Sequence, residues 1–249
     1  PAPLVTEEVT FAAADGRPTR AYYAAHRAAM AESTKGIVLL TDVYGWATEE
    51  ARAAADRLAA SCEAHVLVPD LFRGRPWQQG DKPAGEAFEA WRRAFPAPRV
   101  YADLLGAQAH LNAQCEVELV GLCGFCWGGG RALEALASGA VAAHAVAAFY
   151  PTRYDARLVA AELDVPALAI FAGKDSIPGA DPAAARALEA GLGASPRLRG
   201  DFFVRVFDGQ PHGFAHSPPD EGALRDGDAA FKLAEAWFDK YLHPARLAQ

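Results

Sequence analysis

The stretch VELVGLCGFCWGGG, residues 117–130, decides the fold. It opens with a short, continuous apolar run, which is typical of a strand buried on both faces of a parallel sheet. It goes on with Gly124, Cys126 and Gly128 at alternate positions and ends in two further glycines. Glycines two residues before and two residues after a central residue let a strand and the following helix pass closely, while the central side chain stays exposed. The stretch therefore predicts a strand, a sharp turn that presents Cys126, and a helix.

The rest of the chain repeats this alternation of short apolar runs and helical patterns. The runs predict strands at residues 36–42, 65–70, 117–123, 145–151, 167–173 and 202–208, and the patterns predict helices at residues 48–61, 84–95, 100–113, 128–138, 182–192 and 228–242. Before them, a segment that breaks at Asp15-Gly16 predicts an antiparallel hairpin at the sheet edge. Strands that alternate with helices indicate a mostly parallel, doubly wound α/β sheet with helices on both faces. No repeat or long linker divides the sequence, so we expect residues 1–249 to form one domain.

Composition argues against several classes of protein. The formal net charge is −7 and the pI is near 5.5. Nucleic-acid binding needs clustered lysine and arginine, and the sequence has no basic stripe, so we expect no nucleic-acid partner. No apolar run approaches the roughly 20 residues of a membrane-spanning helix, so we expect no membrane partner. The four cysteines do not make a disulfide scaffold. These features favour a soluble, cytoplasmic protein that binds a small molecule.

Cys123 and Cys126 form a C-x-x-C pair, which is also found in redox dithiols and in metal sites. Here Cys123 ends the predicted strand, whereas Cys126 comes just before the predicted helix, so the two thiols belong to different elements. No second pair of cysteines or histidines completes a set of four zinc ligands. The spacing of the glycines therefore favours Cys126 as a nucleophile, and we expect no metal and no cofactor. A thiol oxidoreductase stays an alternative.

A nucleophile needs a base, and the base needs an acid that orients it. In enzymes with a strand-to-helix nucleophile turn, the acid and then the histidine follow the nucleophile along the chain. Asp175 follows the strand predicted at residues 167–173, and His212 follows the strand predicted at residues 202–208. Taken alone, Asp175 also fits a turn and His212 a surface loop. Because the carboxyl ends of parallel strands converge, we predict a triad of Cys126, His212 and Asp175.

Several motifs together resemble the dienelactone hydrolase family. They are GFCWGG around Cys126, AGKD ending at Asp175, PHGF around His212, TDVYG after the first core strand and VPDLFRG after the second. The resemblance covers residues 4–242 and implies an α/β-hydrolase fold. It also implies hydrolysis of a small ester or lactone through an acyl-enzyme on a Cys-His-Asp triad. A small-molecule binding module with a relic triad stays an alternative.

The resemblance also implies roles for residues outside the triad. The backbone N–H groups of Val43 and Trp127 would form the oxyanion hole, and Asp42 would contact the resting thiol. The family's dienelactone enzymes have glutamate there and hold the substrate carboxylate with two arginines. In this sequence, His216 and Ala84 stand at the places of those arginines. We therefore expect an altered substrate preference.

The segments around these turns supply candidate substrate contacts. They are Tyr44, Trp46, Arg73, Phe88, Trp91, Phe214 and His216. The aromatic members would line an apolar pocket, although a single aromatic side chain is more often packed in a core. Arg73 or Arg75 would supply a positive charge in place of the missing arginines, and a solvated loop pair is the alternative.

Overall fold

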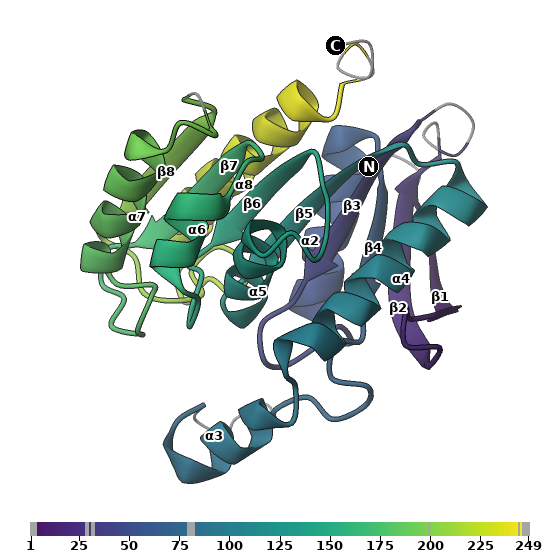
Figure 1. Ribbon diagram of the computed structural model, residues 1–249, viewed down its shortest axis with the longest axis horizontal. Coiled ribbons are helices and arrows are strands. Elements are labelled where there is room, and N and C mark those ends of the chain that lie inside the picture. Colours follow the sequence, from purple (N-terminus) through teal and green to yellow (C-terminus); the bar gives the residue numbers. More distant parts are fainter. Residues whose placement is uncertain are drawn as a thin grey trace.

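The computed structural model describes residues 4–27, 30, 33–78, 83–198, 200–243 and 245. Eight strands form one sheet in the order β1-β2-β4-β3-β5-β6-β7-β8 (Figure 1). The strands are β1 (Leu4–Ala12), β2 (Pro18–His26), β3 (Lys35–Leu40), β4 (His65–Pro69), β5 (Leu119–Phe125), β6 (Ala145–Phe149), β7 (Ala167–Ala172) and β8 (Phe202–Phe207). The strands thus run from Leu4 to Phe207 along the chain, and the helix α8 follows them.

The pairing of the strands confirms the predicted topology. β1 and β2 form an antiparallel hairpin, and β2 pairs antiparallel with β4. All other neighbours, from β4 through β8, are parallel. The strands β4, β6 and β7 are buried along their whole length, which explains their continuous apolar runs. β8 lies at the edge, and its residues alternate in burial.

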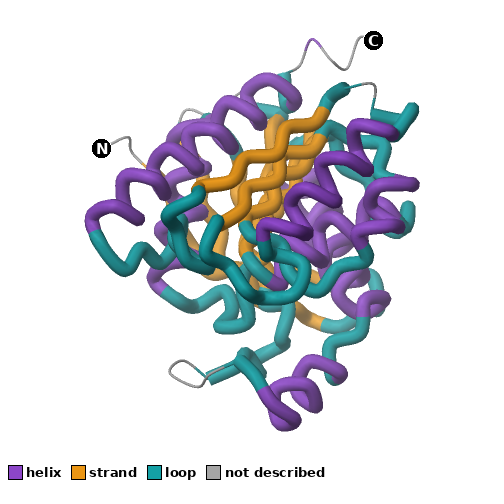
Figure 2. Tube along the Cα trace, turned by 90° about the vertical axis from the view of Figure 1, so that its left-hand side faces the viewer, coloured by secondary structure: helices purple, strands orange, loops and turns teal. Residues whose placement is uncertain are grey.

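Helices cover both faces of the sheet (Figure 2). They are α2 (Glu49–Cys62), α3 (Gly85–Arg93), α4 (Ala97–Cys115), α5 (Trp127–Ala137), α6 (Ala156–Glu162), α7 (Pro182–Ala194) and α8 (Glu221–Tyr241). The apolar sides of α2 and α8 pack in the core of one face, and those of α4, α5, α6 and α7 pack in the core of the other. α3 stands out beyond the end of the sheet at which β4 ends (Figure 1). The predicted doubly wound arrangement is confirmed.

Two helices differ from the prediction. The short helix α6 was not predicted, because seven residues offer too little periodicity to stand out. The last helix begins at Glu221 rather than at residue 228, with the Asp220 carboxylate accepting from the Ala223 N–H at 2.8 Å. In this extra segment, Gly227 packs against the backbone of Ala215. Tertiary packing therefore extends the helix beyond its amphipathic pattern.

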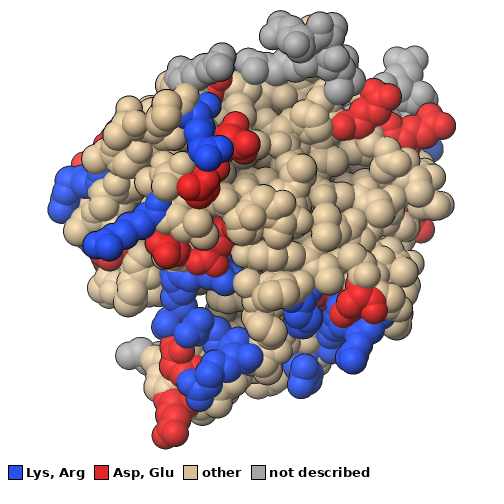
Figure 3. Space-filling view, in the orientation of Figure 1, with Lys and Arg blue, Asp and Glu red and all other residues tan. Residues whose placement is uncertain are grey.

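Acidic and basic side chains are intermingled on the face of the molecule shown in Figure 3. The same face is hollowed between α3 and the rest of the chain. None of the helices in the described ranges is both long and apolar enough to cross a membrane.

Candidate active site

Cys126 stands at the sharp turn between β5 and α5. Its backbone has φ of 53° and ψ of −118°, a region that side-chain-bearing residues rarely occupy. Its N–H donates to the Phe149 carbonyl at 2.9 Å, and its carbonyl accepts from the Gly130 N–H at 3.2 Å. These bonds hold the turn in a strained conformation, as is common where a side chain must be presented to a ligand.

The glycines around Cys126 are there because backbone passes too closely for any side chain. A Cβ atom on Gly124 would lie 2.6 Å from the Gly128 carbonyl oxygen. A Cβ atom on Gly128 would lie 2.4 Å from the carbonyl oxygen of Leu40, and one on Gly130 would lie 2.1 Å from that of Thr152. The strand, the helix and the neighbouring loop can approach only if these positions are glycine.

His212 and Asp175 meet at the same end of the sheet. His212 follows β8, Asp175 follows β7, and His212 Nδ1 lies 2.5 Å from Asp175 Oδ2. The Asp175 side chain is fully buried, and its Oδ1 accepts from the Ile177 N–H at 2.9 Å. The other imidazole nitrogen, Nε2, is buried and has no well-formed hydrogen bond within the described part of the chain. His212 and Cys126 line one cavity.

The electrostatics of the pair favour a charged imidazole. Burial lowers the pKa of His212, but the negative charge of a Cys126 thiolate and the hydrogen bond to Asp175 outweigh it and raise the pKa from 6.5 to about 10. The imidazolium is therefore stabilised when the thiol gives up its proton. A buried histidine between a sulfur and a carboxylate can accept and return a proton in this way.

The resting thiol has a neighbour that the sequence did not reveal. Cys126 Sγ lies 3.9 Å from Thr152 Oγ1, and the Thr152 N–H donates to the Cys126 carbonyl at 3.1 Å. Thr152 is buried and follows β6. The only signal that pointed to it was its place after a predicted strand, at the edge where the other site residues gather.

Asp42 faces the same cavity, but both of its carboxylate oxygens have partners other than the thiol. Its Oδ1 accepts from the Tyr44 N–H at 2.9 Å, and its Oδ2 lies 2.9 Å from His216 Nε2. His216 Nδ1 in turn lies 2.5 Å from the Tyr150 hydroxyl, and its ring stacks on Phe125. Together with His216, the Asp42 carboxylate therefore anchors the turn that carries Val43, and its predicted contact with the thiol stays a prediction.

A cavity of about 380 Å³ lies in front of Cys126. Val43 and Trp127, the predicted oxyanion-hole residues, both line it, and so do the predicted substrate contacts Tyr44 and Phe88. Arg153 also lines it, but its guanidinium pairs with Glu89 of α3 at 2.8 Å. Like Thr152, Arg153 follows β6 and was not singled out from the sequence.

Trp46 and Phe214 do not line this cavity, contrary to the prediction. Trp46 is buried in the core on the face covered by α2, with the guanidinium groups of Arg20 and Arg52 above its ring at 5.1 and 5.2 Å. Phe214 is fully buried and packs on Tyr150, with the ring centres 5.8 Å apart. Both aromatic rings are core residues.

Arg73 and Trp91 also lie outside the cavity lining. The Arg73 guanidinium binds the buried carboxylate of Asp103 at 2.7 Å and that of Asp15 at 2.9 Å, so it is tied into the fold. Trp91 stacks on Phe88 with a centroid distance of 5.4 Å and thus supports the cavity wall from behind. His216 lines a neighbouring cavity, described below.

The C-x-x-C pair does not form a dithiol. Cys123 and Cys126 are both free. Cys123 is fully buried on β5, in the core that α2 and α8 cover, and burial raises its pKa above the usual range. A buried, protonated thiol of this kind is unreactive, which argues against the thiol oxidoreductase alternative.

The fold and the turn at Cys126 together define an α/β-hydrolase. The model of the dienelactone hydrolase family matches residues 20–242. The chain therefore belongs to the dienelactone hydrolase family and is a carboxylic ester or lactone hydrolase.

Individual relatives agree with this membership. The carboxymethylenebutenolidase homologue of Mus musculus is 29% identical over 236 residues, which cover 85% of this chain and 84% of the relative. The Homo sapiens homologue is 28% identical over 221 residues, which cover 85% of this chain and 84% of the relative.

Solved structures confirm the fold. A Klebsiella pneumoniae protein assigned as a dienelactone hydrolase has a TM-score of 0.79 at 20% identity, covering 96% of this chain and 100% of its own. A dienelactone hydrolase-like promiscuous phosphotriesterase from metagenomic libraries has a TM-score of 0.72 at 18% identity, covering 96% of this chain and 98% of its own.

Proposed function

We propose that the protein hydrolyses small esters or lactones with Cys126 as nucleophile, His212 as base and Asp175 as the acid that orients it. The observation that carries the proposal is the shared cavity of Cys126 and His212, with His212 held by Asp175 at 2.5 Å. The strained turn presents the sulfur, and the buried Nε2 is the nitrogen left to take its proton.

In the first half of the reaction, His212 Nε2 takes the thiol proton and the sulfur attacks the substrate carbonyl carbon. The carbonyl oxygen becomes an oxyanion. When the tetrahedral intermediate collapses, the carbon–oxygen bond to the leaving alcohol breaks and the imidazolium gives its proton to that oxygen. The product is a thioester on Cys126 and a neutral alcohol.

The backbone N–H groups of Val43 and Trp127 are proposed to bind the oxyanion. Trp127 is the first residue of α5, where N–H groups have no partner within the helix. Both residues line the cavity beside Cys126. Donors of this kind contribute on the order of 10²-fold or more to the rate, because they are aligned before charge develops.

In the second half, water attacks the thioester carbonyl. His212 takes a proton from the water, the oxyanion forms again, and the Cys126 thiolate leaves with the return of the proton. The carboxylic acid product is released and the resting thiol is restored.

The walls of the cavity indicate an uncharged, largely apolar acyl group. Side chains of Val43, Phe88, Trp127 and Ile177 line it, and its volume of about 380 Å³ suits a small ligand. Among the described residues of the wall, the only arginine is Arg153, and it already has its ion pair with Glu89. The names of the relatives, carboxymethylenebutenolidase homologues, support lactones as well as open esters as substrates.

The test is hydrolysis of p-nitrophenyl acetate by Cys126→Ala, with Cys123→Ala as the matched control. We expect the first variant to lose at least about 10³-fold in kcat/KM, because the nucleophile is gone, and the second to keep its activity. Mass spectrometry of the native enzyme under turnover should show the acyl group on Cys126. Undiminished activity in Cys126→Ala, with the fold intact by circular dichroism, would refute the triad.

A further inference from the structure

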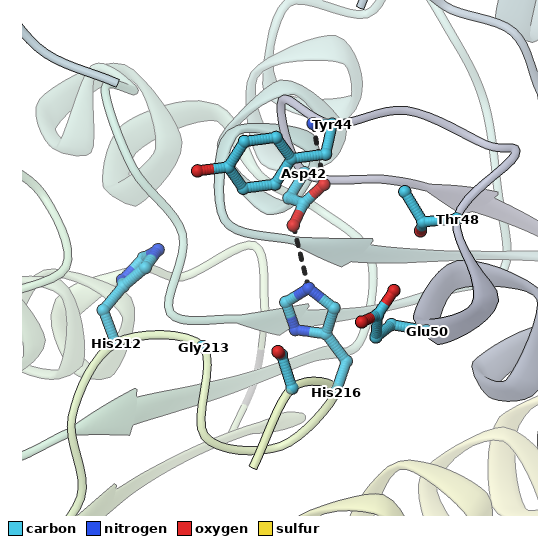
Figure 4. A pocket seen from close by; sticks show the side chains of 8 residues that line it. Asp42, Tyr44, Thr48, Glu50, His212, Gly213 and His216 are labelled. Atoms are coloured by element: carbon cyan, nitrogen blue, oxygen red, sulfur yellow. Dashed lines mark hydrogen bonds and ion pairs between the residues drawn. The ribbon is translucent and has the colours of Figure 1, made fainter. Parts of the chain in front are cut away.

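A second cavity of about 500 Å³ adjoins the one that holds the nucleophile. Its walls include Tyr44, Thr48, Glu50, His212 and His216, whose side chains surround a common space (Figure 4). The two cavities share His212, Tyr44 and Asp42, but only the first contains Cys126. They are two lobes of one site that meet at the imidazole.

The proposed reaction assigns a role to each lobe. The acyl carbon must reach Cys126 and the two oxyanion donors, all of which lie in the first lobe. The leaving oxygen must reach His212, which supplies its proton, and it carries the alcohol part of the substrate with it. His212 faces both lobes, so the alcohol part can extend from it into the second.

The lobes differ in chemistry. Apolar side chains of Val43, Phe88, Trp127 and Ile177 line only the first lobe. The second lacks them and has Thr48, Glu50 and Ser217 in its wall, while Tyr44 is shared by both. The second lobe also contains two carboxylates. That of Asp42 is bonded to His216, while that of Glu50 has no ion pair or hydrogen bond with other described residues. The guanidinium of Arg52, two residues further along α2, is paired with Glu8 at 2.6 Å.

We propose that the second lobe is the leaving-group subsite and that it selects esters of polar, uncharged or cationic alcohols and disfavours anionic ones, with Glu50 as a specificity-determining residue. The inference rests on the proposed function, since it needs His212 to protonate the leaving oxygen. The substrate class is thus an ester with a small apolar acyl group and a hydroxylated or ammonium-bearing alcohol.

The experiment compares kcat/KM for three butanoyl esters that differ only in the alcohol: choline, glycerol and glycolate. At low salt, we expect the choline and glycerol esters to react about 5- to 10-fold faster than the anionic glycolate ester, which is the size of one partly exposed charge contact. Glu50→Lys should reverse the preference of choline over glycolate, and Glu50→Gln should abolish most of it.

The neighbouring residue Glu49 offers a matched control. It lies in the same helical turn but is exposed and outside the cavity walls. Glu49→Lys should change the choline-to-glycolate ratio less than 2-fold, because its charge is screened by solvent. A second control uses ethyl butanoate and ethyl hydrogen succinate, of which the latter carries its charge on the acyl part. Glu50→Lys should change the ratio of their kcat/KM values far less than it changes the choline-to-glycolate ratio.

The outcomes separate this inference from the proposed function. If the wild type hydrolyses all three esters through Cys126 but Glu50→Lys leaves their ratios unchanged, the leaving-group subsite is refuted and the triad stands. If Glu50→Lys changes the ratio between ethyl butanoate and ethyl hydrogen succinate as much as it changes the choline-to-glycolate ratio, the assignment of the lobes is also refuted. If Cys126→Ala hydrolyses the esters as fast as the wild type, both proposals fail.

Discussion

Replacing Asp175 with asparagine tests the orientation of the candidate base. The Asp175 carboxylate makes two hydrogen bonds, one to His212 Nδ1 at 2.5 Å and one from the Ile177 N–H at 2.9 Å. The asparagine carbonyl can keep the bond from Ile177, but the amide NH₂ then faces Nδ1. The imidazole must then accept a hydrogen bond at Nδ1 and carry its own proton on Nε2. Nε2 is the nitrogen proposed to take the thiol proton, so the base would be blocked.

The size of the effect follows from this change of tautomer. We expect Asp175→Asn to lower kcat/KM by about 10³- to 10⁴-fold, which is about 4 to 5.5 kcal/mol of transition-state stabilisation. The pKa of His212 should fall as well, because one of the interactions that raise it is lost. The protein should still fold, since the substitution preserves the shape of the side chain.

The assay is p-nitrophenyl acetate hydrolysis at saturating and limiting substrate, with thermal unfolding as the control for the fold. Asp208→Asn is the matched control, because Asp208 follows the edge strand β8 and is exposed. The control should keep its activity. A loss of less than about 10-fold in Asp175→Asn would show that His212 does not depend on Asp175, and the reasoning would be refuted.

Two further predictions concern the charge on His212 and the turn at Cys126. Beside the Cys126 thiolate the folded pKa of His212 is raised from 6.5 to about 10, so in that ion pair its protonation stabilises the fold fully below about pH 6.5, and this stabilisation is lost as the pH rises through 10. An NMR titration of the ring should show the high pKa in the native enzyme and a lower one in Cys126→Ala; equal values would contradict the coupling. Gly128→Ala should lower the free energy of unfolding by about 2 kcal/mol or more and Tm by about 5 °C, because the new Cβ would lie 2.4 Å from the Leu40 carbonyl oxygen. Gly209→Ala, where a Cβ meets nothing within 4 Å, is the control, and an equal effect in both would overturn the packing argument.

The pairing of His216 with Asp42 shows what a resemblance leaves open. These residues lie 174 positions apart and meet at 2.9 Å. From the sequence, Asp42 was expected at the thiol, because the family places an acid there. In the structure, the carboxylate is bonded to His216 and to the Tyr44 N–H, and Thr152 Oγ1 lies 3.9 Å from the sulfur. Which partner a carboxylate finds depends on what the neighbouring loop presents to it.

The candidate substrate contacts show the same limit. Tyr44 and Trp46 are two residues apart, yet the first lines the cavity and the second packs in the core under Arg20 and Arg52. No periodic pattern governs a loop, so its sequence does not determine where each side chain points. Arg73 was a candidate because its charge could replace that of the missing arginines. Its partner Asp103 sits on a distant helix, α4, and no sequence pattern links the two.

The sequence by itself determined the order of the strands and of the helices other than α6, the turn at Cys126 and the chain order of the candidate nucleophile, acid and base. These features are local: continuous burial requires apolar runs, and close backbone approach requires glycine at set positions. Only the tertiary structure decided which side chains meet at the end of the sheet, that Thr152 neighbours the thiol, and that two lobes join at His212. Those contacts join loops from separate strands, and their geometry is set by how the sheet and helices pack.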